Sequence, residues 1–304
     1  MATEPVRQFY SIGDVCALTD LKPHVLRGYD LGEVFHYINP VMLYTRHLGL
    51  RNYETALAAG DPRAKELSEA VAAVEEVMLA RTDIGANAIY RFFPARSDGD
   101  RTVMIYSSDG KTVLDSLIFG RQSDAPGLCL ADYVASRSSG RTDYLCMFVT
   151  TIGAGVRALA DEWKDRGEYL RSHILQILAL EGAEAFAELL HQKIRQMWGF
   201  GDPPGITMKE LHQAHYHGKR FSFGYPACPR LEDQEKLFRL LEVEKHSIGL
   251  KLTEGFMMDP ESAVSAMVFH HPEARYFSLS AADIEALDRE LSSAPLPPLA
   301  RASQ

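Results

Sequence analysis

The sequence has few cysteines, and they are far apart. The four residues are Cys16, Cys129, Cys146 and Cys228, and no two of them form a C-x-x-C pair. The spacing therefore indicates neither a thiolate zinc site nor a disulfide framework. Free thiols are typical of a reducing compartment, so we expect a cytoplasmic protein.

Long apolar runs are also missing. The longest stretches, such as Tyr144–Val149, are far shorter than the roughly 20 residues that a membrane-spanning helix needs. The first residues contain no basic segment followed by an apolar core, so we predict no signal peptide. The sequence thus predicts no association with a membrane.

Positive charge is scarce, with 32 Lys and Arg against 41 Asp and Glu and a formal net charge of −9. A protein that coats nucleic acid needs excess Lys and Arg to neutralise phosphates, so we predict no nucleic-acid partner. Apolar residues make up 46% of the 304 residues and charged residues 24%. These values are typical of a globular protein and exclude disorder of the whole chain.

Helical periodicity is strongest in the middle of the chain. In the first helical segment, apolar residues recur at helical spacing after Pro62. Pro62 lies near the first turn, where its missing N–H costs nothing. The segment Ser280-Ala-Ala-Asp283 has the pattern of a cap at the start of a last short helix. We expect helices over residues 61–81, 156–163, 168–198 and 231–246.

Strand patterns form separate blocks. We expect strands over residues 88–93, 101–106, 143–150, 263–269 and 275–279, the first two joined as a hairpin. Because strands and helices do not alternate, the order favours an α+β fold with a largely antiparallel sheet. Residues 1–29 are expected to form an N-terminal arm, and the proline-containing residues 292–304 a disordered tail.

A glycine motif follows the strand expected at 143–150. Gly153-Ala-Gly-Val-Arg-Ala158 fits the G-x-G-x-x-A pattern of dinucleotide-binding folds. No second βαβ unit with an acidic strand end follows it, so we favour a plain turn between a strand and a helix.

Two histidine motifs are weak signals of metal binding. The cluster His212-x-x-His215-x-His217 lacks a Cys or carboxylate partner at ligand spacing, so we favour a solvated loop. The pair Glu188-x-x-His191 matches half of a di-iron site, but the second copy is absent. We therefore predict no metal site, although a metal enzyme built on the histidine loop stays open as a third hypothesis.

The segment Arg220–Pro229 is more informative. Two prolines and a glycine fix its backbone, and a rigid, extended loop can present backbone groups to a ligand without an ordering cost. Arg220 carries a guanidinium that can grip a carboxylate with two hydrogen bonds, and Tyr225 adds an aromatic face. The residue types leave two alternatives open, a small-molecule site and a structural loop. We expect Cys228 to be a packed thiol, because no neighbouring charge pattern favours its thiolate.

This segment and its surroundings resemble the C-terminal activation (reactivation) domain of cobalamin-dependent methionine synthase. The resemblance spans roughly residues 30–280 in one order. The matching stretches are Ile84-Gly-Ala-Asn-Ala-Ile-Tyr-Arg-Phe-Phe-Pro94, Leu128-Cys-Leu-Ala-Asp-Tyr-Val134, Ala183-Glu-Ala-Phe-Ala-Glu-Leu-Leu-His191, Gly224-Tyr-Pro-Ala-Cys-Pro229, Leu240-Leu-Glu-Val-Glu-Lys-His246, Lys251-Leu-Thr-Glu-Gly-Phe256, Ser262-Ala-Val-Ser265 and His271-Pro-Glu-Ala-Arg-Tyr-Phe277.

The resemblance implies one curved α+β domain over residues 30–291, with a twisted, mainly antiparallel sheet flanked by helices. It also implies that S-adenosylmethionine (AdoMet) binds in a shallow groove. In this family, the AdoMet methyl group and an electron from flavodoxin or another reductase return cob(II)alamin to methylcobalamin, in support of methionine biosynthesis. Cobalamin would be held by a partner domain or subunit, so this chain would have no catalytic residue and no complete active site of its own.

The resemblance further implies a set of ligand-binding residues. Arg220 matches the arginine that pairs with the AdoMet carboxylate, and Glu184 matches a helix glutamate near the site. The remaining residues of the set are Asn39, Tyr225, Pro226, Ala227, Tyr276 and Phe277.

Two positions depart from the family pattern. Asn39 stands where the family has an aspartate that holds the AdoMet ammonium, and Ala214 stands where it has a glutamate. Losing the charge-assisted part of one such hydrogen bond costs about 1 kcal/mol or more. A second hypothesis is therefore a relative that docks on a corrinoid protein but has lost or changed its AdoMet ligand. The chain has no room for homocysteine, folate or cobalamin modules, so we expect a separately encoded subunit or an excised domain.

Overall fold

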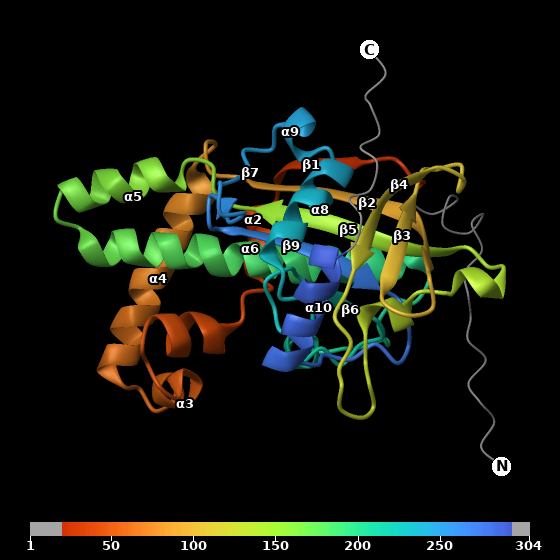
Figure 1. Ribbon diagram of the computed structural model, residues 1–304. Coiled ribbons are helices and arrows are strands. Elements are labelled where there is room, and N and C mark those ends of the chain that lie inside the picture. The colour runs from red at the N-terminus through yellow and green to blue at the C-terminus, as the bar shows by residue number, and fades with distance from the viewer. Residues whose placement is uncertain (1–19, 294–304) are drawn as a thin grey trace.

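The computed structural model describes residues 20–293, and an open sheet of seven strands forms its centre. The strand order is β4-β3-β2-β5-β9-β6, β1 also pairs with β2, and every strand pair is antiparallel. Figure 1 shows the twist of the sheet, with β3 and β4 running steeply across the direction of β5. The strands of this sheet are β1 (His24–Tyr29), β2 (Ala86–Ser97), β3 (Thr102–Tyr106), β4 (Val113–Ile118), β5 (Asp143–Thr151), β6 (Lys219–Phe221) and β9 (Ala263–Phe269), and a separate pair is formed by β7 (Lys251–Leu252) and β8 (Met258–Asp259).

The helices range from one turn to thirty residues. In the described part of the chain, no helix combines the length and apolar composition that crossing a bilayer requires. The α-helices are α2 (Leu31–Phe35), α3 (Tyr53–Ala58), α4 (Pro62–Ala80), α5 (Val156–Asp165), α6 (Tyr169–Trp198), α7 (Met208–His212), α8 (Gln234–Leu240), α9 (Val243–His246) and α10 (Ala281–Ser293). The π-helix η1 (Val41–His47) and the 3₁₀ turns η2 (Leu130–Tyr133), η3 (Arg137–Ser139) and η4 (Leu231–Asp233) complete the set.

Helix α4 begins where the sequence predicts it. The Asp61 carboxylate accepts a hydrogen bond from the Ala64 N–H at 2.9 Å, and Pro62 occupies the first turn. The apolar face that includes Val71 and Met78 is buried in the core. Capping therefore sets the start of this helix, and burial of one face holds it against the rest of the domain.

Both faces of the sheet are covered. Along β5, Cys146 and Phe148 belong to the core under α4, α5 and α6, whereas Leu145, Met147 and Val149 belong to the core on the opposite face. Figure 1 shows α8 and α10 on the side of the sheet away from α6. Burial on both faces explains why β5 is an almost continuous apolar run. The predicted α+β class with an antiparallel sheet flanked by helices is confirmed.

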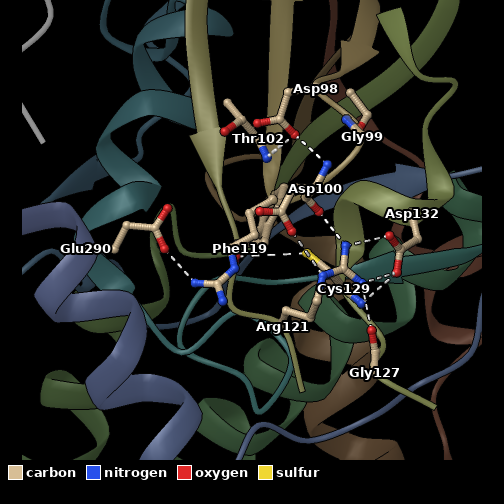
Figure 2. Close-up of polar contacts among 12 residues, drawn as sticks. Asp98, Gly99, Asp100, Thr102, Phe119, Arg121, Gly127, Cys129, Asp132 and Glu290 are labelled. Atoms are coloured by element: carbon tan, nitrogen blue, oxygen red, sulfur yellow. Dashed lines mark hydrogen bonds and ion pairs between the residues drawn. The ribbon is translucent and has the colours of Figure 1, made fainter. Parts of the chain in front are cut away.

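Arg121 fastens the turn between β2 and β3 to η2. Its guanidinium donates to both carboxylate oxygens of Asp132, at 2.7 and 2.9 Å, and to the main-chain carbonyl of Asp100. Figure 2 shows Arg121 between these two residues. The neighbouring Arg101 donates to Glu290 of α10 at 2.5 Å. These contacts bring four segments that are distant in sequence together at one end of the sheet.

The helix expected over residues 231–246 is wrong as a single element. The structure divides it into η4, α8 and α9. The break lies at Glu242, whose φ of +54° is incompatible with a continuing right-handed helix. Two short elements, α7 and β6, also occur within residues 200–230, which lie outside the expected helices and strands.

The strand expected over residues 275–279 is absent from the described sheet. The Leu279 N–H donates to the Pro226 carbonyl at 2.9 Å, and the Arg275 N–H donates to the Tyr133 hydroxyl at 3.4 Å. These backbone groups therefore bond to a loop and a side chain instead of a neighbouring strand.

The N-terminal arm expected over residues 1–29 contains β1, which joins the sheet by pairing with β2. Residues 1–19 lie outside the described residues, as do residues 294–304 of the expected tail. Helix α10 extends to Ser293 and begins with the predicted cap, because the Ser280 hydroxyl oxygen accepts from the Asp283 N–H at 3.2 Å.

Candidate functional site

Arg220 lies in the edge strand β6, and its side chain is 17% exposed. Its Nη1 donates to Oε2 of Glu188 in α6 at 2.5 Å. Within residues 20–293, Nε and Nη2 of Arg220 have no hydrogen-bond partner. That edge of the guanidinium is the one that can donate two parallel hydrogen bonds to a carboxylate. Burial alone would lower the pKa of Arg220, but the charge of Glu188 raises it above its usual range.

Three carboxylates lie on one face of α6, at Glu181, Glu184 and Glu188. Glu188 is paired with Arg220, and Oε1 of Glu181 lies 2.8 Å from Nε2 of His47. Glu184 has neither a hydrogen bond nor an ion pair within the described part of the chain. Burial raises the pKa of Glu184, and the charge of Arg220 offsets part of that rise.

The loop after β6 closes on itself. The Gly224 N–H donates to the Cys228 carbonyl and the Cys228 N–H donates to the Tyr225 carbonyl, both at 2.9 Å. Leu279 donates its N–H to the Pro226 carbonyl, which ties the loop to the following segment. These bonds make the loop a closed turn, so the expectation of an extended loop is wrong. Tyr225 is 60% exposed at its tip.

Cys228 is a buried thiol inside this turn. Its Sγ lies 2.9 Å from the Ser222 carbonyl oxygen, and burial raises the pKa of the thiol. A thiol with a raised pKa is a poor nucleophile at neutral pH. The expectation of a packed cysteine agrees with this environment.

Two aromatic residues lie near Phe221 of β6. The Tyr276 and Phe277 rings lie 5.4 and 6.4 Å from the Phe221 ring, measured between centroids. Tyr276 is 55% exposed, so an aromatic surface stays available at the rim.

Two cavities of about 450 and 350 Å³ lie between α6 and β6. Both are lined by Glu184, Arg220 and Tyr225, and we treat them together as the α6–β6 groove. The predicted residues that line the first cavity are Glu184, Arg220, Tyr225, Pro226, Ala227, Tyr276 and Phe277, and Asn39 lines the second. The structure thus brings all eight predicted residues to one groove, and their contact with a ligand stays a prediction.

The groove also contains residues that sequence reasoning missed as site residues. Tyr37 and Met42 line it without a motif that could have indicated them, and Val264 lies in the matching stretch Ser262–Ser265, which indicated no role for it. Glu188 lines it as well, and its signal was the Glu188-x-x-His191 pair, which points to Arg220 instead of a metal.

The two positions that depart from the family pattern have different surroundings. The side-chain oxygen of Asn39 accepts the Val41 N–H at 3.0 Å at the start of η1, so part of its acceptor capacity is already used. Ala214 follows α7 with a φ of +54° and is not among the residues that line the two cavities.

The histidine loop also has a structural contact. Nε2 of His212 lies 3.1 Å from the Tyr37 carbonyl oxygen. Among residues 20–293, no group of three or more His, Cys, Asp or Glu side chains could hold a metal ion.

The glycines of the motif at 153–158 are explained by close packing. A Cβ on Gly153 would lie 1.8 Å from Cγ of Pro260, and a Cβ on Gly155 would lie 2.6 Å from the Asp83 carbonyl oxygen. The motif is a turn between β5 and α5, as the sequence favoured.

Comparison with known proteins identifies the class of this fold. Residues 30–289 match the family described as vitamin B12 dependent methionine synthase, activation domain. The chain belongs to this family.

The chain is also similar to one relative and to one solved structure. The methionine synthase of Mycobacterium tuberculosis (strain ATCC 25618 / H37Rv) is 33% identical over an alignment of 205 residues, and the alignment covers 64% of this chain and 17% of that protein. This chain therefore spans about a sixth of the length of that relative. The crystal structure of the MetH reactivation domain bound to AdoHcy has a TM-score of 0.82 and 29% identity, and the match covers 90% of this chain and 86% of that chain.

Proposed function

We propose that this chain is the AdoMet-binding reactivation unit of a cobalamin-dependent methionine synthase system, with residues 30–291 as its ligand-binding domain. The observation that carries the proposal is the α6–β6 groove, where one edge of Arg220 and the carboxylate of Glu184 line the same space and have no partner within residues 20–293. A free guanidinium edge and a free carboxylate fit the carboxylate and ammonium of an amino acid. AdoHcy, bound in the similar MetH reactivation domain, carries both groups.

The residues of the groove would act by binding and orienting. Arg220 would hold the ligand carboxylate, Glu184 the ammonium, and Tyr225 and Tyr276 would offer aromatic surface to the adenine or the sulfonium. AdoMet supplies a methyl cation that, with one electron from a reductase, converts cob(II)alamin to methylcobalamin and leaves AdoHcy. No side chain of the groove needs to act as base or nucleophile, because its contribution is proximity.

The proposal implies partners beyond this chain. A cobalamin-binding domain or subunit would meet the rim of the groove, where Tyr225 and Tyr276 are exposed. Flavodoxin or another reductase would supply the electron. The three cysteines within the described residues are unpaired and buried, which is compatible with the expected cytoplasmic location.

Calorimetric titration of the chain with AdoMet and AdoHcy tests the binding step. We expect saturable binding of one molecule per chain and competition between the two ligands. The second step is tested by following cob(II)alamin, bound to its partner domain, during reduction with AdoMet present. We expect methylcobalamin to form only when this chain is added.

Absence of binding for both ligands would overturn the proposal. It would favour the alternative of a relative that docks on a corrinoid protein without AdoMet. Binding without any methylcobalamin would leave the ligand site intact and remove the reactivation step.

A further inference from the structure

A buried polar cluster lies behind Arg220. Nη1 of Arg220 donates to Oε2 of Glu188 at 2.5 Å and lies 3.4 Å from both Nδ1 of His191 and the Tyr216 hydroxyl. The Tyr216 hydroxyl also lies 3.5 Å from Oε2 of Glu188. One amino group of the guanidinium is therefore surrounded, while the opposite edge has no partner among the described residues.

Within this cluster, Glu188 carries the charge that opposes Arg220, whereas His191 is neutral. Burial and the charges of Arg195 and Arg220 lower the pKa of His191 well below its ordinary value, so the ring is neutral and can accept at Nδ1. Glu188 is then the anion that opposes the charge of Arg220. Among residues 20–293, Oε1 of Glu188 is buried without a hydrogen-bond partner, which is costly. A buried ion pair with an unsatisfied oxygen is weak evidence for a stabilising role. The pair points instead to a role in orienting Arg220.

A second set of contacts, around Arg195, holds Tyr216 in place. The Arg195 guanidinium lies 3.7 Å from the centroid of the Tyr216 ring. Its Nε and Nη2 donate to the two carboxylate oxygens of Asp202, both at 2.7 Å, and the Arg195 side chain is 0% exposed. A bidentate pair that is almost completely buried has few alternative geometries. Tyr216 is thus fixed by a stack, and its hydroxyl is fixed beside Arg220.

The chain of contacts continues from Asp202 to Tyr37. Nε2 of Gln192 donates to Asp202 at 3.1 Å, and the Tyr37 hydroxyl donates to Oε1 of Gln192 at 2.5 Å. Tyr37 lines the second cavity of the α6–β6 groove. A chain of direct contacts therefore links Arg220 to Tyr37, and both residues line this cavity.

We propose that Glu188 and Tyr216 are positioning residues that hold Arg220 by Nη1, so that its Nε and Nη2 atoms face the groove and select ligands that carry a carboxylate. The inference rests on the proposed function, because it concerns how the same groove recognises AdoMet. It adds a role for two residues that would not contact the ligand carboxylate themselves.

The test compares AdoMet with decarboxylated AdoMet, which keeps the ammonium and the sulfonium but lacks the carboxylate. We expect the unaltered chain to prefer AdoMet by about tenfold or more in calorimetric dissociation constants. In Glu188→Gln we expect the preference to fall to about threefold or less, through weaker binding of AdoMet alone. Glu75→Gln, which changes a half-buried glutamate of α4 away from the groove, is the matched control and should keep the preference.

A raised preference for AdoMet in Glu188→Gln would have a different physical cause. If Glu188 mainly neutralises Arg220, removing its charge would strengthen the attraction for a carboxylate and raise the preference. A raised or unchanged preference in Glu188→Gln would therefore overturn the inference.

Tyr216→Phe separates geometry from charge and covers the case in which Glu188→Gln does not fold. The variant keeps the ring under Arg195 and removes only the hydroxyl beside Arg220. We expect a smaller fall in the AdoMet preference than in Glu188→Gln, about twofold, in a domain that still unfolds cooperatively. An unchanged preference in a folded Tyr216→Phe would also count against the inference. Failure of the unaltered chain to bind either ligand would instead refute the proposed function on which it rests.

Discussion

Thr150 in β5 donates its hydroxyl hydrogen to the main-chain carbonyl of Ala183 in α6 at 3.1 Å, and both residues are 0% exposed. This bond fixes α6 against the sheet at the residue that precedes Glu184. The free carboxylate of Glu184 is therefore presented to the groove by the core of the domain, and a change in the core would move it.

Replacement of Arg220 should weaken AdoMet binding more than any other single change in the groove. We expect Arg220→Ala to raise the dissociation constant at least about tenfold, because hydrogen bonds to charged groups contribute about 1.5–3 kcal/mol. Calorimetry measures the effect.

Arg220→Ala also leaves the Glu188 carboxylate buried without its partner, so Arg220→Lys, which keeps the charge, should accompany it. We expect Arg220→Lys to weaken binding too, because an ammonium cannot form the two parallel hydrogen bonds. Arg239→Ala, at an exposed position of α8 outside the groove, serves as the control. Unchanged affinity in both Arg220 variants would remove this residue from the site.

AdoMet affinity should depend on pH through Glu184. Burial raises the pKa of this carboxyl above 4.5, so it takes up a proton at a higher pH than an ordinary glutamate. The neutral form attracts an ammonium less strongly. We therefore expect the dissociation constant of AdoMet to rise as the pH falls toward the raised pKa, by about five- to tenfold.

Glu184→Gln should show weak binding at neutral pH and a flatter pH profile. The same steep profile in this variant would assign the titration to another group. Thermal unfolding at each pH checks that the domain stays folded throughout.

Gly153 should tolerate no side chain. A Cβ at this position would overlap the Pro260 ring, so we expect Gly153→Ala to lower the free energy of unfolding by about 1–3 kcal/mol. In Gly201→Ala the nearest atom to the new Cβ would be 3.5 Å away, an ordinary contact. Urea unfolding of both variants makes the comparison, and equal stability would show that the turn between β5 and α5 can widen.

Loss of Arg121 should loosen the end of the sheet without changing the groove. Arg121→Met removes the hydrogen bonds to Asp132 and to the Asp100 carbonyl, and we expect a loss of about 1–2 kcal/mol in the free energy of unfolding. AdoMet affinity should stay the same. Arg51→Met, at an exposed position, is the control. A stability equal to that of the control would mean that solvent replaces these hydrogen bonds at no cost.

The fold was largely predictable where a local pattern is reinforced by the core. The helix from Pro62 and the buried strand from Asp143 appear within a residue or two of their expected limits, because capping and burial act there in the same direction. The helix over residues 231–246 failed at Glu242, since a left-handed residue other than glycine carries no local signal. The strand over residues 275–279 failed because the partners of its backbone groups come from distant segments.

The groove was predictable only through family resemblance. The residue types of Arg220 and Tyr225 indicated a binding site or a structural loop without deciding between them. Glu188 was visible in the sequence only as half of a di-iron pattern, which was not favoured because the second copy is absent. Its pairing with Arg220, 32 residues away, depends on how α6 lies against the edge strand, which no short motif encodes.

The alternation along β5 between the two cores has an evolutionary consequence. Deleting a single residue within this strand would exchange its inward and outward side chains from that point onward. Phe148 would then be forced into the space now filled by Met147 or Val149, and the Thr150 hydroxyl would turn away from α6. We therefore expect relatives of this domain to differ in length at their surface turns and not within β5.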